Sequence, residues 1–455
     1  MLRRLLPALS FTMALTANLC AAQTPVYKLL YSAPTPSSPG AGPVTVFEAA
    51  PGLFYFLSTQ NGPTLGPSIF SITSGGSSPR RIYCLPNYPN YNVISETLVQ
   101  ATNGRLYGAV YIEQTLTSYY YSVATSGQDL RQYPRGRADS LWTMTAAPEG
   151  LYDGFGASTS QGGESYGFVR IDENGKVTLL HALSPSEGVP MPATKLALAA
   201  DGNLYGLGCE TNCTTYFIFR LTQSGEYSHL LALPQSYGGP IASPIAASNG
   251  SLYGVGGEGA NGTGVVYRAT LSGHLQAVAS FPAKGTAEGM LDPNSLMEAS
   301  DYALYGSTLH NAIFRYSMAT HALTNAYQMN LYNLQGSCDP CQFVQAMDGK
   351  LYGTATIGGP GGGAVFSLDF GLPQPRPSVA QLAPASGAPG QQILLWGSHL
   401  LGATSVTFNG VPAAAFQVNS TQAVMATVPA GATTGPVTIT TANGSVTTKQ
   451  DFTAH

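Results

Sequence analysis

Three carboxylates in long polar loops are the residues of this chain that could carry out acid–base chemistry: Glu187, Glu288 and Asp292. Two carboxyl groups about 5–10 Å apart are the machinery with which glycoside hydrolases break a sugar bond. No motif fixes such a pair, because the sequence lacks GxSxG, P-loop and dinucleotide fingerprints and has no histidines at HExxH or HxH spacing. A polysaccharide lyase or glycoside hydrolase is therefore an alternative interpretation and not the first one.

The same irregular loops collect aromatic and charged side chains that would suit a glycan or peptide ligand, although surface loops collect polar residues in any case. The candidate ligand-binding residues are Tyr88, Tyr91, Arg135, Arg137, Asp139, Glu187, Tyr237, Glu288 and Asp292. His181 and His229 are expected in strands as half-buried structural residues. No catalytic residue, metal ligand or cofactor is predicted.

Composition and the N-terminus indicate an exported protein. Only 9% of the 455 residues are charged, and the net charge of −4 argues against a nucleic-acid partner. Arg3 and Arg4, an apolar stretch and Cys20-Ala21-Ala22 predict a cleaved signal peptide over residues 1–22. No later apolar run is long enough to span a membrane. We expect secretion and an extracellular glycan or protein partner, with the oligomeric state left open.

Five cysteines remain after cleavage at that site. In an oxidising compartment, Cys209 with Cys213 and Cys338 with Cys341 are predicted to form local disulfides, which leaves Cys84 alone. The alternatives are a redox pair or half of a zinc site. Neither the βαβ context of the first nor the additional ligands of the second is visible in the sequence.

A recurring phrase organises most of the chain. DGNLYGLG (201–208) returns as NGRLYGAV (103–110), NGSLYGVG (249–256) and DGKLYGTA (348–355), and weaker copies bring the number of units to seven. Asp/Asn-Gly supplies a tight turn, and each unit holds four short strands, which is typical of a propeller blade. Residues 23–372 are thus predicted to form a seven-bladed β-propeller, with residues 26–32 closing the last blade.

The repeat resembles a known family. Its DG-x-LYG phrase, Gly-rich loop and following strand are clearest in VGGEGANGTGVVYRA and TATIGGPGGGAVFSLD. This pattern is similar to the GloVer-type tandem repeat of exported bacterial proteins, over roughly residues 26–372. The resemblance implies a secreted, propeller-like protein and carries no settled activity.

A Pro-rich linker at 373–377 precedes a segment of different character at 378–455. The segment contains ATSVTFNGVPAAAF and ATVPAGATTGPVTITTANG and ends in DFTAH. It resembles the IPT/TIG family, which implies a small immunoglobulin-like β-sandwich that serves as a spacer or adhesion module. The sequence therefore predicts an all-β, secreted, non-catalytic binding, adhesion or scaffolding protein. A purely structural component of the extracellular matrix is a further alternative.

Overall fold

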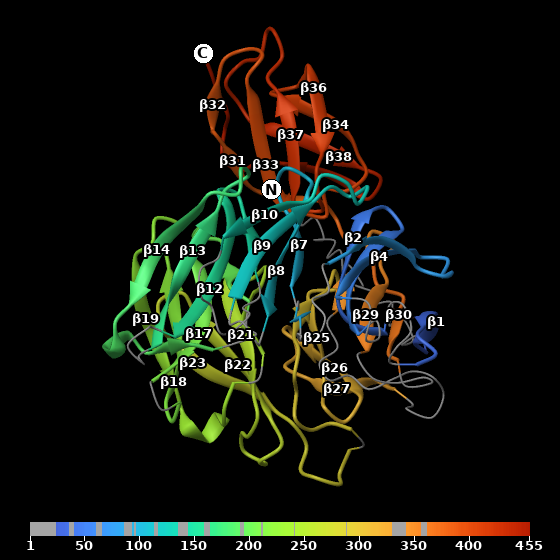
Figure 1. Ribbon diagram of the computed structural model, residues 1–455, viewed down its shortest axis with the longest axis vertical. Helices are drawn as coiled ribbons and strands as arrows, with labels where there is room; N and C mark the ends of the chain where they lie inside the picture. The colour runs from blue at the N-terminus through green and yellow to red at the C-terminus, as the bar shows by residue number, and fades with distance from the viewer. Residues whose placement is uncertain are drawn as a thin grey trace, which may run out of the picture.

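The computed structural model describes residues 24–35, 41–60, 66–85, 93–94, 97–112, 117–134, 144–158, 164–191, 195–210, 213–240, 242–287, 289–329, 343–355 and 362–455. These parts are almost entirely β-strand, with the short 3₁₀ helices η1 (Pro185–Glu187) and η2 (Gln235–Tyr237). Seven antiparallel sheets follow one another along the chain, and three further sheets form a C-terminal unit (Figure 1).

The seven sheets are the blades of a β-propeller. The first strands of neighbouring blades contact one another, so they lie around the axis of the ring and the fourth strands lie outside. Blades 1 to 3 contain β2 (Ala41–Ala50), β3 (Leu53–Gln60), β4 (Ser68–Thr73) and β5 (Arg80–Cys84); β6 (Val93–Ile94), β7 (Leu98–Gln100), β8 (Leu106–Ile112), β9 (Thr117–Val123) and β10 (Arg131–Pro134); and β11 (Thr145–Ala147), β12 (Gly150–Ser158), β13 (Glu164–Ile171) and β14 (Val177–Leu183).

Blades 4 to 7 repeat this arrangement. They contain β15 (Val189–Pro190), β16 (Ala197–Leu198), β17 (Leu204–Cys209), β18 (Tyr216–Leu221) and β19 (Tyr227–Leu233); β20 (Ile245–Ala246), β21 (Ser251–Gly256), β22 (Val265–Thr270) and β23 (Leu275–Ser280); β24 (Met297–Glu298), β25 (Ala303–Ser307), β26 (Ala312–Ser317) and β27 (Leu323–Gln328); and β28 (Phe343–Gln345), β29 (Leu351–Ala355), β30 (Ala364–Asp369) and the N-terminal β1 (Val26–Ser32).

The seventh blade takes its outer strand from the beginning of the chain. β1 runs antiparallel to β30, with Val26 opposite Asp369. Tyr27 stacks on Phe366 with ring centroids 5.4 Å apart, and Leu30 is buried. The pairing brings the two ends of the propeller chain into one sheet and covers the edge of β30, which would otherwise be free to pair with another chain.

The recurring phrase is a turn held by its own side chains. In five blades the Asp or Asn oxygen accepts a hydrogen bond of 3.0–3.2 Å from the backbone N–H two residues later. The same side chain bonds the tyrosine hydroxyl four residues on, as Asp201 does with Tyr205 at 2.8 Å. In blade 6, Tyr302 stands in place of the glycine and takes the left-handed φ of 56° that the turn requires. The phrase therefore serves the fold.

An inter-blade latch joins three blades to the blade before them. In each, a carboxylate or amide oxygen on the first strand accepts a backbone N–H from the preceding blade's turn. The pairs are Glu48 with Met347 (2.8 Å), Glu298 with Ser248 (2.7 Å) and Gln345 with Ser300 (2.8 Å). Burial raises the pKa of Glu48, although the N–H groups of Gly52 and Met347 act in the opposite direction. Glu48 stands where the first and last blades meet.

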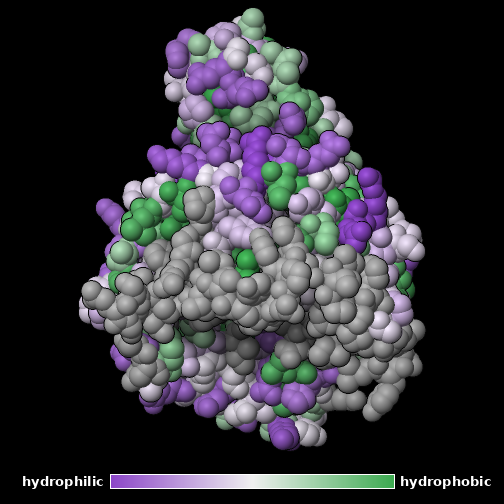
Figure 2. Space-filling model, viewed as in Figure 1, coloured by the Kyte–Doolittle hydropathy of each residue, from purple (hydrophilic) through white to green (hydrophobic). Residues whose placement is uncertain are grey.

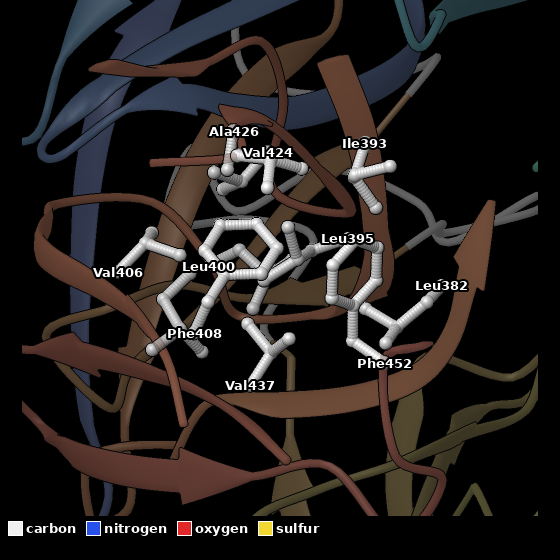
Figure 3. Packing of buried hydrophobic residues seen from close by; sticks show 12 residues of the cluster. Leu382, Ile393, Leu395, Leu400, Val406, Phe408, Val424, Ala426, Val437 and Phe452 are labelled. Carbon is white, nitrogen blue, oxygen red and sulfur yellow. The ribbon is translucent and has the colours of Figure 1, made fainter. Parts of the chain in front are cut away.

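The C-terminal unit is a β-sandwich. Its sheets contain β31 (Ser378–Ala383), β33 (Gln392–Ser398), β37 (Ala423–Thr427) and β36 (Ala415–Val418); β35 (Val411–Pro412), β34 (Ala403–Phe408), β38 (Val437–Thr441) and β39 (Gly444–Thr447); and the short parallel pair β32 (Ser386–Gly387) and β40 (Thr453–Ala454). Leu395, Val406, Phe408, Val424 and Phe452 fill the space between the two large sheets (Figure 3). The unit thus has a hydrophobic core of its own.

The ring has two different faces because its strands are antiparallel. The turn face carries the turns between first and second strands. The connector face carries the loops between second and third strands and the connectors that lead from one blade to the next. The sandwich stands on the turn face (Figure 1 and Figure 2). Asn419 donates to the carbonyl of Thr102 at 2.6 Å, and Asn443 donates to the carbonyl of Met347 at 2.9 Å. These carbonyls hold equivalent places in blades 2 and 7.

An apolar patch completes this docking. Leu394 and Trp396 of β33 point away from the sandwich core and pack against Ala146 and Leu198 of the propeller. Strand register places Ala146 and Leu198 in blades 3 and 4 where Glu48 stands in blade 1. Apolar side chains therefore stand at the latch position in the two blades against which Leu394 and Trp396 pack.

Candidate ligand-binding site

The connector face is the end of the ring that the sandwich leaves uncovered, and it holds three of the nine predicted ligand-binding residues. Glu187, Tyr237 and Asp292 lie on the connectors from blades 3 to 4, 4 to 5 and 5 to 6. Each connector is bonded to a different part of the neighbouring blades, so the three side chains lie at three separate places on the face. Tyr88, Tyr91, Arg135, Arg137, Asp139 and Glu288 lie outside the described residues.

Glu187 attaches η1 to the outer strands of blades 3 and 4 through hydrogen bonds. Its carboxylate binds His181 Nε2 at 3.0 Å and accepts the backbone N–H and hydroxyl of Ser184 at 2.8 and 2.7 Å. Its backbone carbonyl faces His229 Nε2 at 3.0 Å and Tyr227 at 3.2 Å. Burial alone would raise the pKa of Glu187, but the hydrogen bonds from Ser184 and His181 outweigh it and lower the pKa. A carboxylate held ionised in this way is a poor general acid.

Tyr237 and Asp292 likewise hold their connectors in place. The Tyr237 ring stacks on Tyr267 with centroids 5.9 Å apart, and burial raises the pKa of Tyr237. The carboxylate of Asp292 lies 3.0 Å from His310 Nε2, and its backbone bonds Thr263 and Leu309. Hydrogen bonds and stacking thus give both residues structural contacts that the sequence interpretation did not foresee.

A cleft of about 700 Å³ opens beside η1, on the outer flank of blade 4. Its walls come from η1, from the loop between β17 and β18, and from β19, and they include Ser186, Gly188, Glu210, Thr215, Phe217 and His229. Gly188 is required where η1 meets the blade, because a Cβ there would run into the Cys209 carbonyl and the Phe217 ring. Sequence reasoning assigned none of these six residues to a ligand site.

His229 differs from the sequence expectation. It was expected to be half-buried, but it is exposed on β19, with one ring face stacked on Phe217 at a centroid distance of 3.9 Å. His181 is half-buried, as its place in β14 suggested. Both histidines lie on the outer strands of their blades, but the Tyr227 ring and the Glu187 carboxylate cover His181, whereas His229 stacks on Phe217 and stays exposed.

The cysteines near the cleft are paired. Cys209 and Cys213 form a disulfide across the loop that carries Glu210, while Cys84 is a half-buried free thiol. Cys338 and Cys341 lie outside the described residues. Within the described ranges no three His, Cys, Asp or Glu side chains gather as a metal site would require. No helix in those ranges has the length and apolar character needed to cross a membrane.

Comparisons with known proteins agree with this architecture. Residues 377–454 match the family model described as IPT/TIG domain. No curated protein sequence matches the chain.

Among solved structures, the WD40 β-propeller domain of Doa1 is similar at 8% identity and a TM-score of 0.48, covering 75% of this chain and 96% of that one. The extracellular domain of a B. thetaiotaomicron protein described as a hybrid two-component system has 12% identity and a TM-score of 0.49, covering 94% of this chain and 57% of its own. These likenesses concern the fold alone. The chain combines a seven-bladed β-propeller, defined by its own seven sheets, with a C-terminal IPT/TIG domain.

Proposed function

We propose that the protein is a secreted, non-catalytic binding protein that presents the connector face of its propeller to an extracellular ligand. The observation that carries the proposal is that the two ends of the ring differ in what they contact. The IPT/TIG domain covers the turn face through Asn419, Asn443 and Trp396, whereas the cleft beside η1 opens on the outer flank of blade 4 at the connector end of the ring. The domain then acts as a docked cap on the ring, and adhesion would involve its outer surface.

The hydrogen bonds of Glu187 and Asp292, two of the three predicted acid–base candidates, support binding over catalysis. Glu187 is ionised and bonded to Ser184 and His181, and Asp292 is bonded to His310. Neither carboxylate is left to donate a proton to a leaving group. Export and membership among GloVer-type repeat proteins belong to the same proposal, supported by the N-terminal signal pattern and the repeated phrase.

A binding screen with a parallel turnover assay tests the proposal. The mature chain, residues 23–455, is applied to a glycan array and to purified extracellular matrix proteins, and each bound glycan is then incubated with the chain and analysed for cleavage products. Saturable binding without products is expected. Cleavage products would establish the enzyme alternative, and an absence of binding in both arms would overturn the proposal. N-terminal sequencing of chain recovered from the medium should start at Gln23.

A further inference from the structure

The cleft beside η1 offers the groups that bind sugars. His229 presents an exposed imidazole face, and Phe217 supports the ring from behind at 3.9 Å between centroids. Glu210 contributes a carboxylate that makes no side-chain hydrogen bond within the described residues, and Ser186 and Thr215 contribute hydroxyls. An aromatic face packs against the C–H face of a pyranose, and a carboxylate accepts two neighbouring hydroxyls.

The charge of the cleft selects against acidic ligands. No lysine or arginine lines it in the part of the chain that the structure describes, and its side walls carry the Glu210 carboxylate. A sulfate or uronate group would meet a negative charge with no cation to offset it. A neutral ligand rich in hydroxyls matches these walls.

The walls are held in position before any ligand arrives. The carbonyl of Glu187 bonds both His229 and Tyr227, which ties η1 to β19. The Glu187 side chain fixes the turn from within through Ser184 and His181. The disulfide between Cys209 and Cys213 closes the loop that carries Glu210. A pre-formed site loses little conformational entropy on binding.

We propose that this cleft binds a neutral polysaccharide chain, with His229 as the stacking platform and Glu210 as the hydroxyl acceptor; this rests on the proposed function. Leu230 and Leu231 also line the cleft, but both are half-buried against the core between blades 4 and 5, so little of either side chain is left to anchor a peptide. The cleft lies on the outer flank of the ring, where a long chain can pass without threading the central axis.

Affinity electrophoresis followed by calorimetry tests the inference with the full mature chain. The probes are soluble xylan, galactomannan, hydroxyethyl cellulose and starch as neutral polymers, with polygalacturonate as the acidic one. We expect retardation by at least one neutral polymer and none by polygalacturonate. His229→Ala and Glu210→Gln should each weaken that binding at least tenfold.

The chain supplies matched controls. Glu258 stands five residues after Tyr253, as Glu210 stands five residues after Tyr205, but it lies in blade 5 outside the cleft. His274 is an exposed histidine in a turn on the opposite face. Glu258→Gln and His274→Ala should leave affinity within twofold of wild type.

The outcomes separate the two proposals. Neutral-polymer binding that is unaffected by His229→Ala and Glu210→Gln would overturn this cleft while leaving a binding propeller in place. Binding of polygalacturonate alone, or binding of a matrix protein alone in the screen described above, would overturn the neutral-glycan assignment. Binding to none of these polymers would overturn this inference, whereas the proposed function falls only if the arrayed glycans and the matrix proteins also fail to bind.

Discussion

Trp396 is the residue whose replacement tests the docking of the IPT/TIG domain most directly. It is 4% exposed, yet it lies outside the hydrophobic core of its own domain and packs against Ala146 and Leu198 of the propeller. A buried tryptophan removes about 150–250 Å² from water, which at about 25 cal/mol/Å² corresponds to about 4–6 kcal/mol. Because Trp396 also packs against Leu394, Ala423 and Met425 of its own domain, only part of that area belongs to the interface, and Trp396→Ala should weaken docking by about 2–3 kcal/mol.

Differential scanning calorimetry gives the measurement. We expect wild type to unfold with the cap and ring coupled. In the variant the cap should unfold separately, with a midpoint lowered by about 8–24 °C, since a domain of 60–100 residues loses about 4–8 °C per kcal/mol. Phe416→Ala is the control, because Phe416 is 36% exposed on the free edge strand β36 of the same sheet. A Trp396→Ala thermogram that superimposes on wild type would refute the assignment of Trp396 to the interface.

Three other changes probe the ring. Glu48→Ala removes the acceptor for two backbone N–H groups at the junction of blades 1 and 7 and should cost about 2–4 kcal/mol in urea denaturation. Because burial raises the pKa of Glu48, the folded state binds the proton of this carboxyl group more tightly than the unfolded state does. The free energy of unfolding should therefore fall as pH rises from the ordinary glutamate pKa through the raised one. Glu48→Gln should flatten this pH dependence. Tyr205→Phe removes the hydroxyl bonded to Asp201 and should cost about 1 kcal/mol in stability. Burial and Asp201 raise the pKa of Tyr205 to about 12, so the variant should lose one tyrosine that titrates near that pH in ultraviolet absorbance. A chain without residues 24–33 leaves β30 as a free edge and should elute as oligomers in size-exclusion chromatography. A monomeric elution would show that the pairing of β1 with β30 is dispensable.

Local sequence patterns predicted the propeller because each blade repeats the same short-range bonds. Asp201 and Tyr205 lie four residues apart, so the turn and the strand that follows it can be predicted without tertiary information. The latch could also have been found: Glu298 and Gln345 each stand three residues before the turn aspartate. Its partner could not, because the bonded N–H belongs to the preceding blade and carries no side-chain signature.

The candidate ligand site was harder to predict from the sequence than the fold. The sequence interpretation chose charged residues in connectors, and it selected Glu187 without its partners His181 and Ser184, which turn it into a structural bond. The cleft residues Glu210 and His229 lie in the loop after β17 and in β19, and they line one cleft together with η1, so no local sequence pattern marks them. One signal for the docked cap was present: Ile393–Trp396 is apolar at consecutive positions, which is typical of a strand buried on both faces.

The seam between β1 and β30 also sets an order of events in folding. β1 leaves the ribosome first, but its partner is the last strand of the ring, as the pairing of Val26 with Asp369 shows. Closing a loop of that length must wait until every blade has been made, and contacts so distant in sequence slow folding. A variant in which residues 24–33 are moved from the N-terminus to a position directly after β30 makes the closing contact local. It should refold faster than the natural chain while keeping the same ring.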